Sequence, residues 1–328
     1  MDTQPATWQR VLAEAFTNID SLCDYLKISP DDLDVLPEYR TFPLKVPRGF
    51  AECMEPGNPS DPLLRQVLPL RNELLDYPGY SHDPVGDQQA VAETGVIHKY
   101  HGRVLLIATG ACAVHCRYCF RRNFPYTELQ LSTHKIQQAI DYIVSRTEIS
   151  EVILSGGDPL LLSDDKLELL LEKLAAIPHV QRIRIHSRVP IVLPVRINDR
   201  IFGAFDRLPQ QVVMVFHANH PNELSCEVKM VCAKLRHRGV TLLNQSVLLK
   251  GVNDNDQVLC RLSEKLFTFG ILPYYLHLLD KASGTGHFEV TKADAKILLN
   301  SLQQRLPGYL VPKLVEERQG AAYKLPIC

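Results

Sequence analysis

From residue 103 onward, short runs of branched and apolar residues alternate with longer segments whose apolar residues recur at helical spacing. This alternation predicts repeated βα units and therefore a parallel sheet of the α/β class. We expect strands at 104–109, 152–155, 183–186, 212–217, 242–249 and 273–278, and helices at 164–176, 221–238, 256–269 and 291–305. Six units are fewer than the eight of a closed barrel, so the sequence predicts a partial (β/α)6, TIM-like barrel.

Two segments flank the repeats. Residues 8–26 place apolar side chains at helical spacing and precede Pro30, which predicts one amphipathic helix docked on the barrel. Residues 37–87 are rich in proline and glycine and predict an irregular lead-in. We expect an N-terminal extension over 1–90, the barrel over 91–305, and a C-terminal segment over 306–328 that closes one side of the barrel.

Composition limits the classes of partner. The 328 residues are 45% hydrophobic and 22% charged, which is typical of a globular protein, and the formal net charge is -1. A nearly neutral chain has no general field that attracts nucleic acid or an anionic membrane. No apolar run approaches the length of a membrane span, and the nine cysteines follow no apolar leader, which favours a reducing compartment. We expect a cytoplasmic protein whose partners are small molecules.

Polar and reactive residues gather where the predicted strands end. Barrel enzymes build their active sites on the loops after the carboxyl ends of the strands, so we expect these residues to share one rim. After the cysteine-rich stretch that follows the first strand, they are Ser155, Gly156, Gly157, Asp158, His186, Arg188, His217, His220, Asn244, Gln245 and Asp280.

The cysteine-rich stretch has the spacing C-x3-C-x2-C, formed by Cys112, Cys116 and Cys119. Three thiolates on one loop can hold three irons of a cubane cluster and leave the fourth iron open to a small molecule. The alternatives are buried structural cysteines or half of a zinc site. The pair Gly156-Gly157 at the end of the second strand exposes backbone groups against which a ligand's amino and carboxylate groups can lie, although such pairs also form ordinary turns.

Together these two motifs resemble the radical S-adenosylmethionine (radical SAM) superfamily. Within it, the chain resembles the lysine 2,3-aminomutases over most of residues 60–324. The narrower resemblance rests on Cys-Arg-Tyr-Cys-Phe-Arg-Arg at 116–122, Leu-Ser-Gly-Gly-Asp-Pro-Leu at 154–160, Asn-His-Pro-Asn-Glu at 219–223, and residues 243–254. Residues 116–126 and 308–313 further resemble the short members that make (R)-β-lysine for modification of translation elongation factor P.

The resemblance implies three cofactors: a 4Fe-4S cluster on the three cysteines, S-adenosylmethionine, and pyridoxal 5'-phosphate. It implies that Lys324 forms the resting Schiff base, whereas by itself this residue would be a solvated tail lysine. The family often surrounds this lysine with several glycines, of which only Gly320 is present. Arg103 and Lys99 match positions that contact the cofactor phosphate, although both could be ordinary charges beside a strand.

The same resemblance implies how substrate and S-adenosylmethionine are held. Arg121 matches the residue that pairs with the substrate carboxylate, and Asp280 and Glu317 match the acidic pair that holds the distant ammonium group. The 155–158 motif and the pair Asn244-Gln245 are expected to contact S-adenosylmethionine. His186, Arg188, His217 and His220 lie on the same rim without individual roles.

The resulting prediction is an isomerase that converts L-lysine to β-lysine, in the R form, by radical migration of the amino group. It implies lysine and an electron donor as partners and a functional link to elongation factor P modification. One alternative is an aminomutase for another amino acid. The other is a noncatalytic metal-binding or RNA-associated accessory protein, against which the absence of a basic patch argues.

Overall fold

The computed structural model describes residues 7–36, 42–129, 131 and 133–328. A single ten-stranded sheet follows the order of the chain from β1 to β10. Strands β3 to β9 pair in parallel, whereas β1 and β2 at one edge and β10 at the other pair antiparallel. The strands are β1 (Val91–Glu93), β2 (Val96–Tyr100), β3 (Arg103–Thr109), β4 (Glu151–Gly156), β5 (Arg182–Ser187), β6 (Gln211–Phe216), β7 (Thr241–Val247), β8 (Leu272–His277), β9 (Lys313–Glu316) and β10 (Leu325–Pro326).

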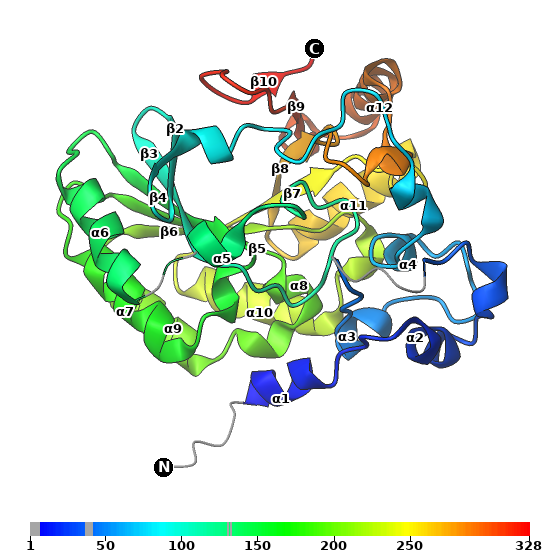
Figure 1. The fold of residues 1–328 in the computed structure, drawn as a ribbon, viewed down its shortest axis with the longest axis horizontal. Coiled ribbons are helices and arrows are strands. Elements are labelled where there is room, and N and C mark those ends of the chain that lie inside the picture. Colours follow the sequence, from blue (N-terminus) through cyan, green and yellow to red (C-terminus); the bar gives the residue numbers. More distant parts are fainter. Residues whose placement is uncertain (1–6, 37–41, 130, 132) are drawn as a thin grey trace.

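Helices cover the outer side of this curved sheet, so the partial barrel is confirmed (Figure 1). The longer ones are α6 (Thr133–Val144), α7 (Asp164–Ala175), α9 (Asp199–Asp206), α10 (Cys226–His237), α11 (Asp256–Thr268) and α12 (Lys292–Arg305). Short helices are α1 (Thr7–Ala13), α2 (Ile19–Leu26), α3 (Arg48–Ala51), α4 (Pro62–Arg65), α5 (Tyr126–Leu129) and α8 (Val189–Val192). Single 3-10 turns are η1 (Pro30–Asp32), η2 (Arg71–Leu74), η3 (Gln88–Ala90), η4 (Pro159–Leu161), η5 (Pro194–Arg196), η6 (Pro221–Glu223), η7 (Gly286–Phe288) and η8 (Gly308–Leu310).

All six predicted strands are present, but the prediction was one parallel strand short. β9 lies beside β8, with Tyr275 opposite Lys313 and His277 opposite Val315. Its four residues carry too little periodic signal to be recognised locally, and the strand forms because the edge of β8 offers hydrogen-bond partners. The C-terminal segment therefore extends the sheet, which brings Glu317 and Lys324 to the barrel.

The prediction of one helix over residues 8–26 is wrong. The segment forms α1 and α2, separated where Phe16 pairs with Val46 through two backbone hydrogen bonds of 2.8 and 2.9 Å. Asn18 then begins α2 by accepting a hydrogen bond from the backbone nitrogen of Ser21. Both helices still pack as expected, because Trp8 and Leu22 are buried in the same hydrophobic core as the barrel.

Each barrel strand alternates between an outer face packed on helices and an inner face. In β7, Leu242, Asn244 and Ser246 are buried, whereas Gln245 between them is half-buried. Asn244 and Ser246 line a small gap together with residues of α11, which places them on the helix side. Because successive side chains of a strand point to opposite faces, Gln245 faces the interior of the barrel.

None of the helices in the described ranges is long and apolar enough to cross a membrane.

Candidate active site

The cysteine loop follows β3 at the carboxyl end of the barrel. Cys112, Cys116 and Cys119 are free thiols, and the backbone nitrogen of Cys119 donates to the carbonyl of Cys116 at 3.0 Å. Burial, followed by the charge of neighbouring thiolates, raises the pKa of Cys112 well above its usual value and that of Cys119 to about 11. Among the described residues, no three His, Cys, Asp or Glu side chains converge as ligands of one metal ion. A cubane cluster needs no such convergence, because each thiolate binds a different iron.

Arg188 joins this loop to the barrel. Its Nη1 donates to Sγ of Cys116 at 2.8 Å, and its Nη2 donates to Glu223 at 3.1 Å and to Gln66 at 2.8 Å. Its Nε is buried without a partner within the described structure. Arg188 therefore ties Cys116 to Gln66, before the barrel strands, and to Glu223, after β6.

Glu73 binds two arginines of the same loop, a contact that we call the Glu73 clamp. The sequence did not single out this residue. Glu73 accepts hydrogen bonds from Arg117 Nε at 2.8 Å and Nη2 at 2.5 Å, and from Arg122 Nη2 at 2.6 Å. All three side chains are buried. Such a charge cluster is stable only when it is fully paired, so it holds the loop in one position. No local signal reveals it, because Glu73 lies in the irregular lead-in.

The glycine pair at the end of β4 packs directly against the start of the cysteine loop. Gly156 has φ of +115°, and a Cβ there would lie 2.6 Å from the carbonyl oxygen of Thr109. A Cβ on Gly157 would lie 2.4 Å from the carbonyl oxygen of Ala111, and the Gly157 nitrogen donates to Thr109 at 2.7 Å. Only glycine permits this approach of two backbones.

Asp158 follows the pair, but its carboxylate faces the protein and not the rim. It accepts hydrogen bonds from Ser187 Oγ at 2.7 Å and from the backbone nitrogens of Arg188 at 2.8 Å, Val189 at 3.1 Å and Leu160 at 3.1 Å. Burial still raises its pKa to about 6. This geometry opposes the predicted cofactor contact by the side chain, and Asp158 instead ties β4 to β5.

The predicted contact by Asn244 also conflicts with the structure. Its side chain donates to the Ala218 carbonyl at 3.1 Å and to Ser246 at 2.9 Å, and it accepts from the Ala218 nitrogen at 3.0 Å. Because it lies on the helix side of β7, it joins β7 to the loop after β6. His220 likewise serves the backbone, since its Nδ1 accepts from the Asn222 nitrogen at 3.2 Å.

The barrel interior contains polar atoms that lack partners. Gln245 Nε2 lies 3.0 Å from His217 Nε2, and the rings of His186 and His217 are 5.7 Å apart. Within the described ranges, Gln245 Oε1, His186 Nε2 and His277 Nε2 are buried without hydrogen bonds. Burial lowers the pKa of all three histidines, that of His217 to about 3, so the rings are neutral. Buried polar atoms without partners indicate space for a polar ligand.

A chain of alternating charges crosses the mouth of the barrel. Lys324 Nζ lies 2.5 Å from Glu317 Oε2, and Glu317 Oε1 lies 3.1 Å from Lys99 Nζ. Lys99 Nζ then lies 2.5 Å from Asp87 Oδ1, and Asp87 Oδ2 lies 2.7 Å from Arg121 Nε. The tertiary structure thus brings together four residues that the sequence predicted separately, and it adds Asp87, which was missed. The only local hint was the turn at Gly86, where φ is +69°.

Asp280 lies beside this chain. Burial, and then the charge of Glu317, raise its pKa to about 7. Burial also acts on Glu317, but Lys324 and Lys99 outweigh it and hold the pKa of Glu317 at about 2. Two carboxylates whose protonation depends on a nearby ammonium group form a suitable site for a cation.

Arg103 faces Tyr100, the residue after Lys99. Its guanidinium is 5.3 Å from the ring centroid of Tyr100, at the amino end of β3. The structure pairs the other predicted phosphate ligand, Lys99, with carboxylates. The assignment of both residues to a phosphate stays a prediction.

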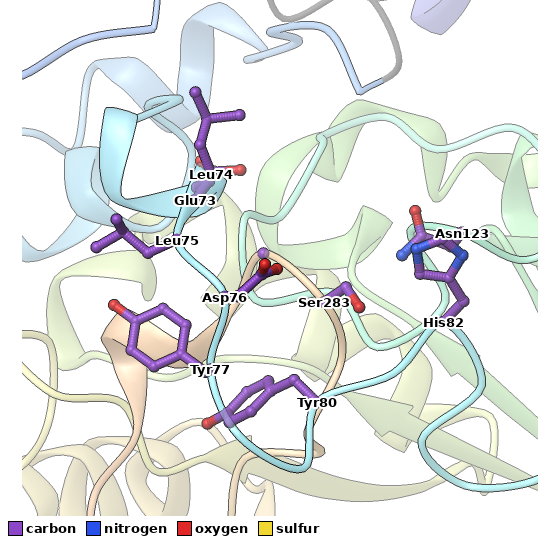
Figure 2. Close-up of a pocket in the computed structure, with 10 residues that line it drawn as sticks. Glu73, Leu74, Leu75, Asp76, Tyr77, Tyr80, His82, Asn123 and Ser283 are labelled. Atoms are coloured by element: carbon purple, nitrogen blue, oxygen red, sulfur yellow. The ribbon is translucent and has the colours of Figure 1, made fainter.

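A separate hollow of about 130 Å3 lies next to the Glu73 clamp (Figure 2). Its polar lining includes Glu73, Asp76, Tyr77, His82 and Ser283. None of the residues in the alternating charge chain lines this hollow.

Comparison with known proteins agrees with this geometry. Residues 106–262 match the Radical SAM superfamily. The L-lysine 2,3-aminomutase of Escherichia coli (strain K12) is 48% identical over 98% of this chain and 94% of its own length. The protein belongs to the L-lysine 2,3-aminomutase family. Members of the same name from Haemophilus influenzae and Clostridium subterminale are 46% and 33% identical, over 97% and 98% of this chain and 94% and 77% of their own lengths.

Among solved structures, a radical SAM methyltransferase from Sphaerobacter thermophilus aligns over 67% of this chain and 68% of that chain, with 16% identity and a TM-score of 0.49.

Membership of the lysine 2,3-aminomutase family implies a 4Fe-4S cluster, S-adenosylmethionine and pyridoxal phosphate. The residues present fit all three groups. Cys112, Cys116 and Cys119 supply three thiolates on one loop, and the glycine pair beside them exposes backbone atoms. The unpartnered atoms of the barrel interior can accept polar groups of the cofactors, and Lys324 supplies a primary amine at the barrel mouth.

Proposed function

We propose that this protein converts L-lysine to (R)-β-lysine by moving the amino group between adjacent carbons. The observation that carries the proposal is the alternating charge chain, in which Lys324 contacts Glu317 and is linked through Lys99 and Asp87 to the buried Arg121. A free amino acid with a cationic side chain has the complementary charges: one carboxylate for Arg121, and a distant ammonium group for Asp280 and Glu317.

When bound, the cluster with S-adenosylmethionine supplies a hydrogen-abstracting radical, and pyridoxal phosphate supplies a carbonyl that can hold the migrating amino group. The protein holds the substrate at both ends. Arg121 binds the carboxylate through its Nη groups, because its Nε is engaged by Asp87. Asp280 and Glu317 bind the distant ammonium group, and two carboxylates favour lysine over an acidic amino acid.

Lys324 must lose a proton before its amine can react with a carbonyl. Its Nζ pairs with Glu317, and Lys99 pairs with the same carboxylate. Once Lys324 is bound to the cofactor, Glu317 is left to Lys99 and to the ammonium group of the substrate. The barrel interior, with its neutral histidines, keeps bulk water away from the reacting carbons.

The biological setting is part of the proposal. We infer that the product serves the modification of translation elongation factor P in the cytoplasm, and that a reduced electron-transfer partner feeds the cluster. The sequence at 116–126 and 308–313, together with the 48% identity to the Escherichia coli enzyme, supports this inference.

Anaerobic reconstitution tests the reaction. Protein loaded with iron, sulfide and pyridoxal phosphate, then reduced in the presence of S-adenosylmethionine and L-lysine, should release β-lysine, detected by mass spectrometry after chiral derivatisation. Free L-lysine should be the substrate, whereas Nε-acetyl-lysine, which lacks the ammonium group, and L-glutamate should not be. Absence of β-lysine from protein with an intact cluster contradicts the proposal.

The second candidate is an aminomutase for an amino acid without a cationic side chain. Asp280→Asn distinguishes the two. It should abolish most activity if the substrate is lysine, because it removes half of the ammonium site, and it should change activity little for a neutral substrate.

A further inference from the structure

Asp87 lies in the alternating charge chain between Arg121 and Lys99. We propose that Asp87 is a positioning residue that sets the orientation of the Arg121 guanidinium for the substrate carboxylate. The inference rests on the proposed function, because it assigns Arg121 to an amino acid substrate.

The backbone at Asp87 is held rigidly. Its nitrogen donates to Asp83 Oδ1 at 2.9 Å, and the nitrogen of Gln88 donates to the other oxygen of Asp83 at 3.1 Å. Gly86 precedes it at φ of +69°, where a Cβ would meet the Gln319 side chain at 2.7 Å. Asp87 is only 3% exposed. The Asp87 carboxylate is therefore held in one position, and the groups that bind it are positioned by it.

Asp87 divides its two oxygens between two cations. Oδ2 accepts from Arg121 Nε at 2.7 Å, and Oδ1 lies 2.5 Å from Lys99 Nζ. A two-point pairing with Arg121 alone would occupy one of its Nη groups as well. Because the second oxygen is engaged by Lys99, Asp87 binds Arg121 through Nε, and the Nη donors are left for other acceptors.

The remaining contacts of Arg121 fix the plane of its guanidinium. Nη1 donates to Ser155 Oγ at 3.2 Å, and the guanidinium lies 4.8 Å from the ring centroid of Phe120 and 5.9 Å from that of Phe124. Arg121 is 8% exposed, so loss of the Asp87 charge would leave the guanidinium buried without the carboxylate that pairs with it. A buried charge without its partner reorients toward water or another anion.

The charge of Asp87 persists through the working pH range. Burial opposes ionisation, but Arg121 and then Lys99 outweigh it and lower the pKa of Asp87 below its usual value. Its charge is therefore available to pair with Arg121 and Lys99.

The test compares ligands with and without a carboxylate. Isothermal titration calorimetry on protein loaded with cluster and pyridoxal phosphate, without S-adenosylmethionine, measures binding of L-lysine and of 1,5-diaminopentane. Asp87→Asn should weaken lysine binding about tenfold or more and leave diaminopentane binding within about twofold, as expected for loss of an ionic partner worth ~1.4 kcal/mol or more. In turnover, KM should rise more than kcat falls, and Asp87→Glu should restore part of the affinity.

Glu93→Gln is the matched control. Glu93 lies in the same segment, accepts a hydrogen bond from the Thr94 nitrogen at 2.8 Å, and can keep that bond as glutamine. It should bind both ligands like the wild type. Equal loss of both ligands in Asp87→Asn, or unchanged lysine binding, overturns the positioning role.

A double-mutant cycle covers the case in which Asp87→Asn folds poorly. Arg121→Gln combined with Asp87→Asn removes both members of the buried pair and leaves no uncompensated charge between them. If Asp87 acts through Arg121, adding Asp87→Asn to Arg121→Gln should weaken lysine binding no further, whereas additive losses contradict the inference. Wild-type protein that binds no lysine would overturn the proposed function itself, which separates the two failures.

Discussion

Nζ of Lys324 lies 2.5 Å from Oε2 of Glu317, so the amine expected to hold pyridoxal phosphate is paired with the carboxylate expected to hold the substrate's ammonium group. If Glu317 holds the substrate's ammonium group as proposed, the ammonium group of Lys324 lies in the same place. A Lys324 bound to pyridoxal phosphate no longer needs Glu317 as its counterion. Binding of the cofactor should therefore free Glu317 for the ammonium group of the substrate.

The variant Lys324→Arg tests the amine of Lys324 separately from its positive charge. Arginine keeps a positive charge beside Glu317, so the variant should fold, but it cannot form an imine. Borohydride reduction with pyridoxal phosphate, followed by mass spectrometry of peptides, should label residue 324 in the wild type and not in the variant. Lys313→Arg, at an exposed lysine of β9, should label normally, and equal labelling of wild type and Lys324→Arg would refute the assignment.

Asp280 should make the ligand-free protein less stable as pH rises. Its pKa is about 7 in the folded protein, mainly through burial, and about 4 in an unfolded chain. Between these values the folded state binds more protons, so the free energy of unfolding falls as pH increases. Asp280→Asn removes this penalty and should be more stable than wild type by ~1–3 kcal/mol at about pH 8, with no difference near about pH 4. Urea unfolding at both pH values checks the sign, and a wild type that gains stability relative to the variant as pH rises would contradict it.

The three loop cysteines should each be required for the cluster. Alanine at Cys112, Cys116 or Cys119 should abolish the broad 4Fe-4S absorbance and most of the iron bound after reconstitution, because three thiolates are the minimum set for an open-iron cubane. Cys53→Ala and Cys226→Ala are the controls and should bind iron as the wild type does. Iron retained by any of the three loop variants, or lost in a control, would point to another ligand set.

Gly157→Ala should disturb the cysteine loop. Its new Cβ would lie 2.4 Å from the Ala111 carbonyl, so one of two backbones must shift, and we expect a loss of ~2–4 kcal/mol in the free energy of unfolding. Gly203→Ala provides the contrast, because Gly203 lies in helix α9 with its nearest neighbour at 3.7 Å. That change should stabilise the protein by up to ~1 kcal/mol. Similar denaturation midpoints for the two variants would mean that the loop and β4 yield without strain.

Strand alternation and loop motifs are local properties, and the sequence predicted them well. All six expected strands are present, because each carries its own apolar run and is followed by an amphipathic helix. The N-terminal helix was predicted too long because the pairing of Phe16 with Val46, which interrupts it, involves a residue distant in the chain. β9 was missed for the related reason that its partner strand supplies most of its stability.

The barrel class and the cysteine loop follow from local sequence, because βα alternation and the spacing of Cys112, Cys116 and Cys119 act over short stretches of chain. The face that each polar residue occupies depends on how the strands pack in the folded protein. Asn244 and Gln245 are neighbours in sequence, yet one serves the helix layer and the other the interior, since side chains alternate along a strand. Asp87 was likewise not recognisable from sequence. It pairs with Lys99 and Arg121, which are distant in the chain and are brought together by the fold.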